Sequence, residues 1–344
     1  MRHAIATVVA MLASFSACCE QSYIAPLAEK SVLLDVAATN FVVMVGERGH
    51  VLLSADGKTF HQADVPSTTM LTAVDIFENN VWAVGHDAVI LHSADAGNTW
   101  EQQFSAPEFQ RPFLDVLFFD DLHGIAVGAY GLFYRTLNGG KSWQPELHAT
   151  LLPTADREYL EEIKQEDESF YEQELNSILP HINRITNIGD RLFIAGEAGL
   201  LAASEDQGKS WARFDVEYTG SFFDIKPLDE KTIMAVGLRG NIFVMRDQGN
   251  WQYVNTCSTS TLNSIFVASA EKVVALGNNG MMVALERPLP VSQSGPSADP
   301  SQCQPAAGIS VTQLEGKAAI LNAVTFNKHT LAVTANGIKY LHLD

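Results

Sequence analysis

Short apolar runs separated by tight polar turns recur along almost the whole chain. Phe41 to Val45 and Val81 to Val84 are nearly unbroken runs of this kind. Strands that are covered on both faces have such a pattern, because none of their positions faces water. The runs lead into glycine-containing turns, where hairpins need positive φ angles that glycine adopts without a steric clash. The pattern therefore predicts many short antiparallel strands in stacked sheets.

A short motif ending in Val or Ile opens one repeating unit and occurs seven times. Between its final residues the spacings are 38, 42, 69, 40, 40 and 59 residues. A four-stranded propeller blade takes about 40 residues. We therefore predict an all-β fold, a seven-bladed β-propeller of four-stranded antiparallel blades that forms a single domain over residues 22–344. The final residues of the motif are Val36, Val74, Val116, Ile185, Ile225, Ile265 and Val324.

The two long spacings predict insertions at residues 148–181 and 288–308. The first follows the third unit, and apolar positions at helical spacing predict a helix over residues 156–179. Residues 156–174 hold nine acids and two bases. The helix is expected either to pack on the propeller rim or to present an acidic surface to a partner, and the two roles are compatible. The second insertion is rich in Pro, Ser and Gln, which predicts a flexible loop on the opposite face.

Asp boxes follow the third strand of several units, for example Ser93 to Trp100 and Ser204 to Trp211. Their Asp and Ser side chains are expected to bind turn backbone, so their predicted role is structural. The last unit stops after its third strand, and residues 22–28 are predicted to supply the missing outer strand and close the ring.

The first residues are typical of an export signal, predicted over residues 1–18. Arg2 precedes an apolar, uncharged run, and small residues follow it. Cys18 completes a poor match to a bacterial lipoprotein cleavage box, so a lipid anchor at Cys18 and ordinary cleavage near Ser16 both stay open. We expect the mature protein in the periplasm or on the periplasmic side of a membrane.

Cys257 and Cys303 lie far downstream and pair only if the chain brings them together. Their predicted positions are on opposite faces of the propeller, which argues against a disulfide. A long loop that folds around the blade edge would remove this objection.

Composition narrows the range of partners. The chain has 40 acidic and 22 basic residues, a net charge of −18. Nucleic acid and anionic membrane surfaces need Lys and Arg, so neither is an expected partner. Hydrophobic residues make up 47% of the chain, which supports a large core. We expect a monomer.

The stretch from Leu114 to Trp143 closely resembles the photosystem II stability/assembly factor family, whose relatives also occur in bacteria without photosynthesis. Residues 41–60, 81–100, 192–211 and 233–251 repeat it more loosely. For photosynthetic members the resemblance implies a lumenal or periplasmic propeller that binds newly made reaction-centre protein, with binding linked to a cluster of arginines. Here the turns carry Arg48 and Arg239 and the chain is strongly acidic, which favours a role with another membrane complex.

The turns between second and third strands are predicted to surround one mouth of the channel, on the face that also carries the helical insertion. Such loops on a rigid scaffold commonly bind partners. Each residue alone is better explained as a solvated turn residue, so the hypothesis concerns the ring as a group. The predicted partner-binding residues are Glu47, Arg48, His86, Asp87, Tyr130, Glu197, Arg239, Asn278 and Asn279 on the turns, and Glu161, Glu162 and Glu166 on the helix.

A glycan-binding or sialidase-like Asp-box propeller is the alternative class. Asp35, Asp115 and Asp224 are the carboxylates to consider for hydrolysis, but they occupy one repeat column, which predicts a structural role. The sequence offers neither the arginines and Tyr–Glu pair of a sialidase nor a spacing of His, Cys and Asp that suggests a metal site. We therefore expect a binding protein without catalytic residues, metal or cofactor.

Overall fold

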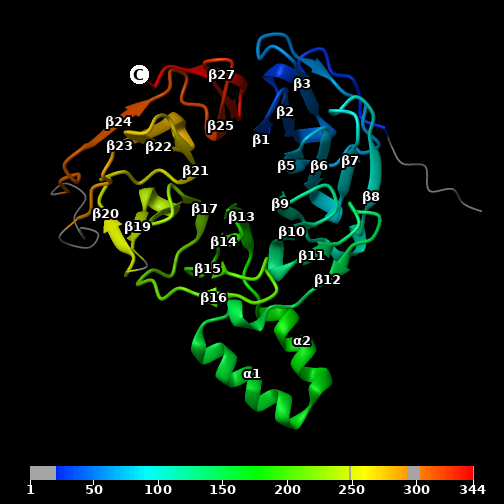
Figure 1. The fold of residues 1–344 in the computed structure, drawn as a ribbon, viewed down its shortest axis with the longest axis vertical. Coiled ribbons are helices and arrows are strands. Elements are labelled where there is room, and N and C mark those ends of the chain that lie inside the picture. Colours follow the sequence, from blue (N-terminus) through cyan, green and yellow to red (C-terminus); the bar gives the residue numbers. More distant parts are fainter. Residues whose placement is uncertain (1–20, 248, 293–302, 344) are drawn as a thin grey trace, which may run out of the picture.

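The computed structural model describes residues 21–247, 249–292 and 303–343. Seven antiparallel sheets stand in a ring, so the fold is the predicted seven-bladed β-propeller (Figure 1). Six sheets have four strands, and the seventh has three in the part of the chain that is described. The predicted signal peptide, with Cys18, lies outside the described residues.

In every blade the strands follow chain order from the channel to the rim. Blade one contains β1 (Leu33–Ala38), β2 (Val42–Gly46), β3 (Val51–Ser54) and β4 (His61–Gln62). Blade two contains β5 (Leu71–Phe77), β6 (Asn80–Gly85), β7 (Ile90–Ser93) and β8 (Glu101–Phe104). Blade three contains β9 (Phe113–Phe118), β10 (Gly124–Gly128), β11 (Phe133–Thr136) and β12 (Gln144–Pro145).

The remaining blades repeat this order. Blade four contains β13 (Ile182–Ile188), β14 (Arg191–Gly196), β15 (Leu201–Ser204) and β16 (Ala212–Arg213). Blade five contains β17 (Phe222–Pro227), β18 (Thr232–Gly237), β19 (Ile242–Arg246) and β20 (Gln252–Val254). Blade six contains β21 (Leu262–Val267), β22 (Lys272–Gly277), β23 (Met281–Glu286) and β24 (Ile309–Gln313), and blade seven contains β25 (Ile320–Phe326), β26 (His329–Thr334) and β27 (Gly337–Leu341).

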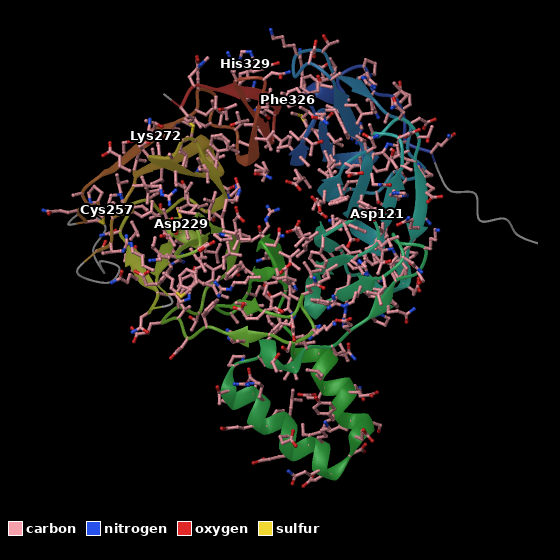
Figure 2. All side chains as sticks on the ribbon, viewed as in Figure 1. Asp121, Asp229, Cys257, Lys272, Phe326 and His329 are labelled. Atoms are coloured by element: carbon pink, nitrogen blue, oxygen red, sulfur yellow. A yellow bond between two sulfur atoms is a disulfide. The ribbon has the colours of Figure 1, made fainter. Side chains whose placement is uncertain are left out.

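The core lies between neighbouring blades, which explains why the second strands are apolar on both faces. All five residues of β2 are buried, and Val43 and Val45 pack toward blade two while Val42 and Met44 pack toward blade seven. The closing interface uses the same principle: Phe326 of blade seven packs with Leu33 and Leu52 of blade one (Figure 2). The ring is therefore closed by apolar packing between its last and first blades.

The Asp boxes have the predicted structural role. In blade two the Oδ1 atom of Asp95 accepts a hydrogen bond from the Thr99 backbone N–H (2.8 Å), and the Ser93 hydroxyl accepts one from Gly97 N–H (2.9 Å). Gly97 has a φ of 87°, a left-handed conformation that favours glycine. The box thus fixes a sharp turn by satisfying its own backbone.

Carboxylates at the inner ends of blades one, three and five link each of these blades to the next. The Oδ2 atoms of Asp35, Asp115 and Asp224 accept hydrogen bonds from backbone N–H groups of the following blade. The distances are 3.0 Å to Val74, 2.7 Å to Ile185 and 2.7 Å to Ile265. Because a buried backbone N–H needs an acceptor, this repeat column is structural, as predicted.

The helical insertion lies between blades three and four, as predicted, but it forms two helices instead of one. They are α1 (Thr154–Glu166) and α2 (Glu168–Ile178). Asp167 interrupts the helix because its backbone is extended (φ −153°), and its side chain accepts hydrogen bonds from Ser169 and Phe170 N–H at the start of α2. Asp at this position is a favoured N-cap. The resulting helical hairpin projects from the rim beyond β12 and β16 (Figure 1).

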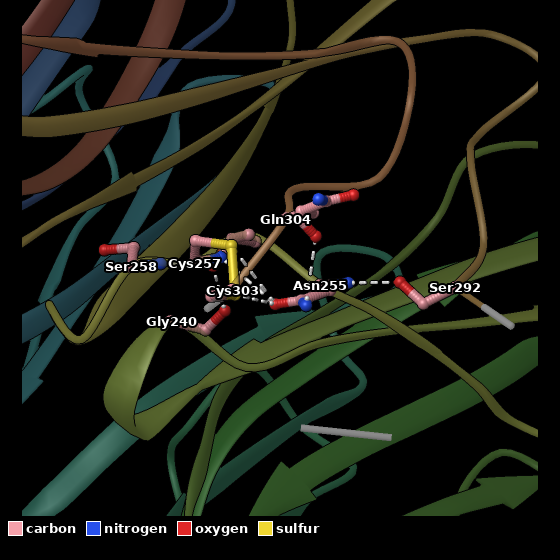
Figure 3. The surroundings of a disulfide bond; sticks show 8 residues. Gly240, Asn255, Cys257, Ser258, Ser292, Cys303 and Gln304 are labelled. Carbon is pink, nitrogen blue, oxygen red and sulfur yellow. Dashed lines mark hydrogen bonds between the residues drawn. A yellow bond between two sulfur atoms is a disulfide. The ribbon is translucent and has the colours of Figure 1, made fainter. Parts of the chain in front are cut away.

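A disulfide joins Cys257 and Cys303, with 5.7 Å between their Cα atoms (Figure 3). The argument against this pair assumed that the second insertion stays on one face. Instead the insertion crosses the outer edge of blade five: Ser292 N–H donates to Tyr253 O (2.9 Å), and Ala306 N–H donates to Asn255 O (2.9 Å). Cys303 thereby reaches the connection that follows β20.

The prediction that residues 22–28 form the outer strand of blade seven is wrong. Among the described residues no strand pairs with the outer side of β27. Residues 22–25 bind blade one instead, where Ser22 N–H donates to Val65 O (2.8 Å) and Ala25 N–H donates to the Gln62 side chain (2.8 Å). Ala28 begins the short 3-10 helix η1 (Ala28–Lys30), which lies against β27.

Candidate functional site

The turns between second and third strands are exposed and share one backbone geometry. Their second residue is left-handed in six blades although it is never glycine, with φ between 51° and 58°. Those residues are Arg48, Asp87, Tyr130, Ala198, Arg239 and Asn279. Positive φ is uncommon for residues other than glycine, so its recurrence marks one turn conformation that the six blades share.

Backbone hydrogen bonds place these turns on the same face as the connections between blades. Gly49 N–H donates to Thr69 O (2.8 Å) in blade one, and Gly131 N–H donates to Pro180 O (2.9 Å) in blade three. Each turn joins the middle strands of its blade, so the turns lie partway out toward the rim. The channel itself is lined by residues of the first strands, and the predicted ring of turns surrounds the mouth without lining it.

The channel holds a cavity of about 200 Å³ with an arginine at the position where blades one, three and five carry aspartate. Arg184 of β13 lies between Asp115 of β9 and Asp224 of β17, with nitrogen–oxygen distances of 3.5 Å and 3.4 Å. Burial acts to lower the pKa of Arg184, but the nearby carboxylates of Asp115, Asp224 and Asp35 outweigh it and raise that pKa. The arginine therefore stays charged and joins blades three, four and five at their inner ends.

Blade three carries a pocket of about 280 Å³ on the face of the turns. It lies between the connection from blade two, the outer strands of blade three and helix α2. We call it the blade-three pocket; its lining includes Phe109, Arg111, Tyr130, Pro145, Leu147 and Asn176. Phe109, Tyr130 and Leu147 are each more than 40% exposed, so the pocket presents apolar surface to solvent.

Tyr130 is held in place by neighbours on both sides. The Arg111 guanidinium lies 5.3 Å from the centre of its ring, and the His181 ring meets it edge to face at 4.4 Å. His181 is in turn bound by Glu197, whose carboxylate accepts from the His181 backbone N–H at 3.3 Å. The structure thus brings Tyr130 and Glu197, two of the predicted residues, together through His181.

The lining of the blade-three pocket includes a fixed negative charge, that of Glu146. Burial opposes ionisation of Glu146, but hydrogen bonds from His148 and Arg135 lower the pKa of Glu146 to about 2. Arg135 Nε donates to it at 2.5 Å, and His148 Nε2 lies 3.0 Å from it. Glu146 is therefore ionised at neutral pH and forms an ion pair with Arg135 of β11.

The helical hairpin packs on itself and touches the propeller at its base. Leu160, Leu175 and Leu179 are buried in one cluster, and Leu179 fills the space beside Gly131. Arg213 of β16 donates to Leu151 O at 2.5 Å and so fixes the start of the insertion. The predicted residues Glu161, Glu162 and Glu166 are exposed on α1.

Other predicted residues remain separate, on their own blades. His86 and Asp87 are exposed on blade two, Arg239 on blade five, and Asn278 and Asn279 on blade six. Sequence reasoning missed Phe109, Arg111 and Leu147. They lie in connections that the repeat pattern does not describe, so only the folded chain shows that they join Tyr130 in one pocket.

The family model described as photosynthesis system II assembly factor YCF48 matches residues 20–107 and 105–251. The chain belongs to this family. It is 28% identical over 156 residues to the chloroplast photosystem II stability/assembly factor HCF136 of Oryza sativa subsp. japonica, which covers 44% of this chain and 32% of the relative. It is 27% identical over 175 residues to the photosystem II assembly lipoprotein Ycf48 of Prochlorococcus marinus, covering 44% and 51%. The chain thus spans a third to a half of the length of these curated relatives.

Solved structures of the family share the fold over nearly the whole chain. The structure titled "YCF48 bound to D1 peptide" superposes with a TM-score of 0.62 at 14% identity, covering 93% of this chain and 94% of that one. At this identity the likeness shows the fold alone. Within the described residues, no helix is long and apolar enough to cross a membrane, and no cluster of His, Cys, Asp or Glu fits a metal ion.

Proposed function

We propose that this protein is an exported, non-catalytic assembly factor that binds a segment of a membrane protein on the face of the turns, with the blade-three pocket as the binding site. It acts as a monomer on the periplasmic side of the membrane. The observation that carries the proposal is the blade-three pocket itself, an exposed apolar recess between a rigid blade and the helical hairpin.

The chemistry of the surroundings indicates which kind of segment fits. Phe109, Tyr130 and Leu147 offer apolar and aromatic surface, which favours an apolar side chain as the anchor. The adjoining hairpin carries exposed acids such as Glu161, Glu162 and Glu166. An apolar residue flanked by Lys or Arg would therefore be attracted by the hairpin and anchored in the pocket.

Family membership and the disulfide support the two other parts of the proposal. A propeller of the same fold is titled as bound to a D1 peptide, and curated relatives are named as photosystem II assembly proteins. Disulfides form and persist in oxidising compartments and are rare in the cytosol, so the Cys257–Cys303 bond favours export. The Prochlorococcus relative is named a lipoprotein, in keeping with an exported site of action.

The proposal is tested by tagging the full-length protein and capturing its partners from detergent-solubilised membranes. Tyr130→Asn removes the aromatic ring while retaining a residue that tolerates the left-handed backbone. We expect it to lower recovery of the bound membrane protein about tenfold, on the order of one lost aromatic anchor. Lys328→Asn is the matched control, because Lys328 is exposed and left-handed (φ 66°) on the opposite face.

Deleting residues 155–179 tests the hairpin separately. The hairpin has its own apolar cluster, so we expect the deleted protein to keep its β-type circular dichroism and to lose much of its partner recovery. A loss of the β signal would show that the hairpin serves the fold. If Tyr130→Asn and Lys328→Asn recover equal amounts of partner, the blade-three pocket is not the binding site, and a glycan array is the next assay.

A further inference from the structure

In the part of the chain that the structure describes, blade seven differs from the other six blades at its outer edge. Within the described part of the chain its sheet ends at β27, whereas the other six sheets have an outer strand. The connection from blade seven to blade one has the same geometry as the other connections. Glu29 O lies against Gly337 just as Ser67 O lies against Gly49 in blade one. Residues 28–30 therefore follow the usual path between blades. The chain departs from the pattern of the other blades just before residue 28.

The residues that would form the strand are held on blade one. Gln62 Nε2 donates to Tyr23 O (2.9 Å), and Val65 N–H donates to the Ser22 hydroxyl (3.1 Å). Tyr23 and Ile24 are 73% and 53% exposed, so they fill no interior space between the blades. Residues 338–340 of β27 line a pocket of about 460 Å³, together with Lys58 and Phe60 of blade one.

This blade-seven pocket is lined by Lys30, Lys58, Phe60, Ile338, Lys339 and Tyr340, together with Glu29 and Asn336. Three lysines stand against one glutamate in a chain whose net charge is −18. Phe60 and Ile338 belong to the apolar cluster between blades seven and one, so they offer apolar contacts beneath the lysines. Tyr340 is fixed by its hydroxyl, which donates to Gly57 O at 2.8 Å.

We propose that an extended segment of another polypeptide, alternating apolar and acidic residues, docks here as the fourth, antiparallel strand of blade seven. An open sheet edge supplies backbone donors and acceptors, and side-chain pockets beside it select the sequence. Phe60 and Ile338 contact the apolar side chains, and the three lysines pair with the acidic ones. The site is distinct from the blade-three pocket, which lies on another blade and is flanked by acids.

The test uses the purified chain and a fluorescent peptide of about seven residues that alternates Val with Glu, the usual length for a strand. We expect saturable binding and slower amide hydrogen exchange in β27 when the peptide is present. The same peptide with Lys in place of Glu, and one whose alternate backbone nitrogens are methylated, should both fail to bind. The first removes charge complementarity, and the second removes the donors of the added strand.

Lys58→Glu should weaken binding of the acidic peptide about fivefold to tenfold, since it replaces an attraction by a repulsion. Lys141→Glu is the matched control: Lys141 has the same place in the Asp box of blade three, whose outer strand β12 is present. Equal weakening by the two variants would overturn the proposal. So would binding of the methylated peptide, or β27 amides as protected in the free protein as those of β11, since the chain would then fill the position itself.

Discussion

Blades five and seven differ in how the outer edge of the sheet is covered at the rim. The outer strand of blade five is only three residues long, but the second insertion lies along it and is fixed by the disulfide (Figure 3). Blade seven has no described outer strand, and three lysines surround its open edge. Lysine is a common means of protecting a sheet edge from unwanted pairing.

In the described part of the chain, blade seven closes the ring with three strands. Blade seven packs against both neighbours through its three inner strands, with Leu331 and Val333 facing blade one and Ala332 facing blade six. Blade seven is therefore held in the ring by its contacts with the neighbouring blades. The second insertion and both candidate pockets lie at the outermost described strands of their blades.

The largest expected difference between the two blades is in how much their inner ends contribute to the free energy of unfolding. Asp224→Ala removes the partner of Arg184 and the acceptor of Ile265 N–H in one step. Loss of one partner of a buried ion pair costs about 3–5 kcal/mol, and we expect a decrease of that order in the free energy of unfolding by urea. Asn322→Ala in blade seven removes one hydrogen bond to Asp35 and should cost about 1 kcal/mol. Equal losses in the two variants would show that the ion pair with Arg184 does not make the inner end of blade five more stabilising than that of blade seven.

The rim of blade five should depend on its covalent bond. Replacing Cys257 and Cys303 together by Ser should lower the free energy of unfolding by about 2–4 kcal/mol. Amide exchange in β20 should accelerate, because the insertion that covers it is released, while exchange in β27 should stay as it is. If β20 exchanges at the same rate without the disulfide, the hydrogen bonds from Ser292 and Ala306 hold the insertion by themselves.

A smaller effect is expected from pH at the channel, which both blades share. Burial raises the pKa of Asp75 to about 6, despite hydrogen bonds from Phe118 and Ile76 N–H. Between about pH 4 and pH 6 the folded protein therefore holds a proton on Asp75 that the unfolded chain has released. The resulting contribution to the free energy of unfolding is full below about pH 4 and is lost as the pH rises through about 6. Because Asp75 is partly exposed to the channel, we expect about 1 kcal/mol, less than the full value of the shift.

Urea titrations of Asp75→Asn at several pH values measure this contribution. The variant should lose less stability than the parent between about pH 4 and pH 8. Asp56→Asn is the control, because hydrogen bonds from Thr59 and Lys58 N–H lower the pKa of Asp56 to about 2, and its contribution is lost only as the pH falls toward that value. A steeper decline in Asp75→Asn than in the parent would contradict the assigned proton.

Features repeated in several blades were predictable from the sequence, because each copy shows the same local pattern again. The opening motif, the turns and the Asp boxes each recur, so the number of blades and the structural role of Asp35, Asp115 and Asp224 followed from their column. The helical insertion was also predictable from apolar spacing. Its break at Asp167 was not, since capping competes with helix continuation at a single residue.

The sequence by itself determined the propeller, its seven blades and the sites of its two insertions, because these depend on local periodicity. Only the tertiary structure decided how the segments that occur once, without a counterpart in the other blades, lie on that scaffold. They are the loops that carry Cys257 and Cys303, residues 22–25 on blade one, and the connections that bring Phe109, Arg111 and Leu147 to Tyr130. Each of these depends on where a loop crosses a blade edge. Many paths of similar local energy are open to such a loop, and long-range packing selects one of them.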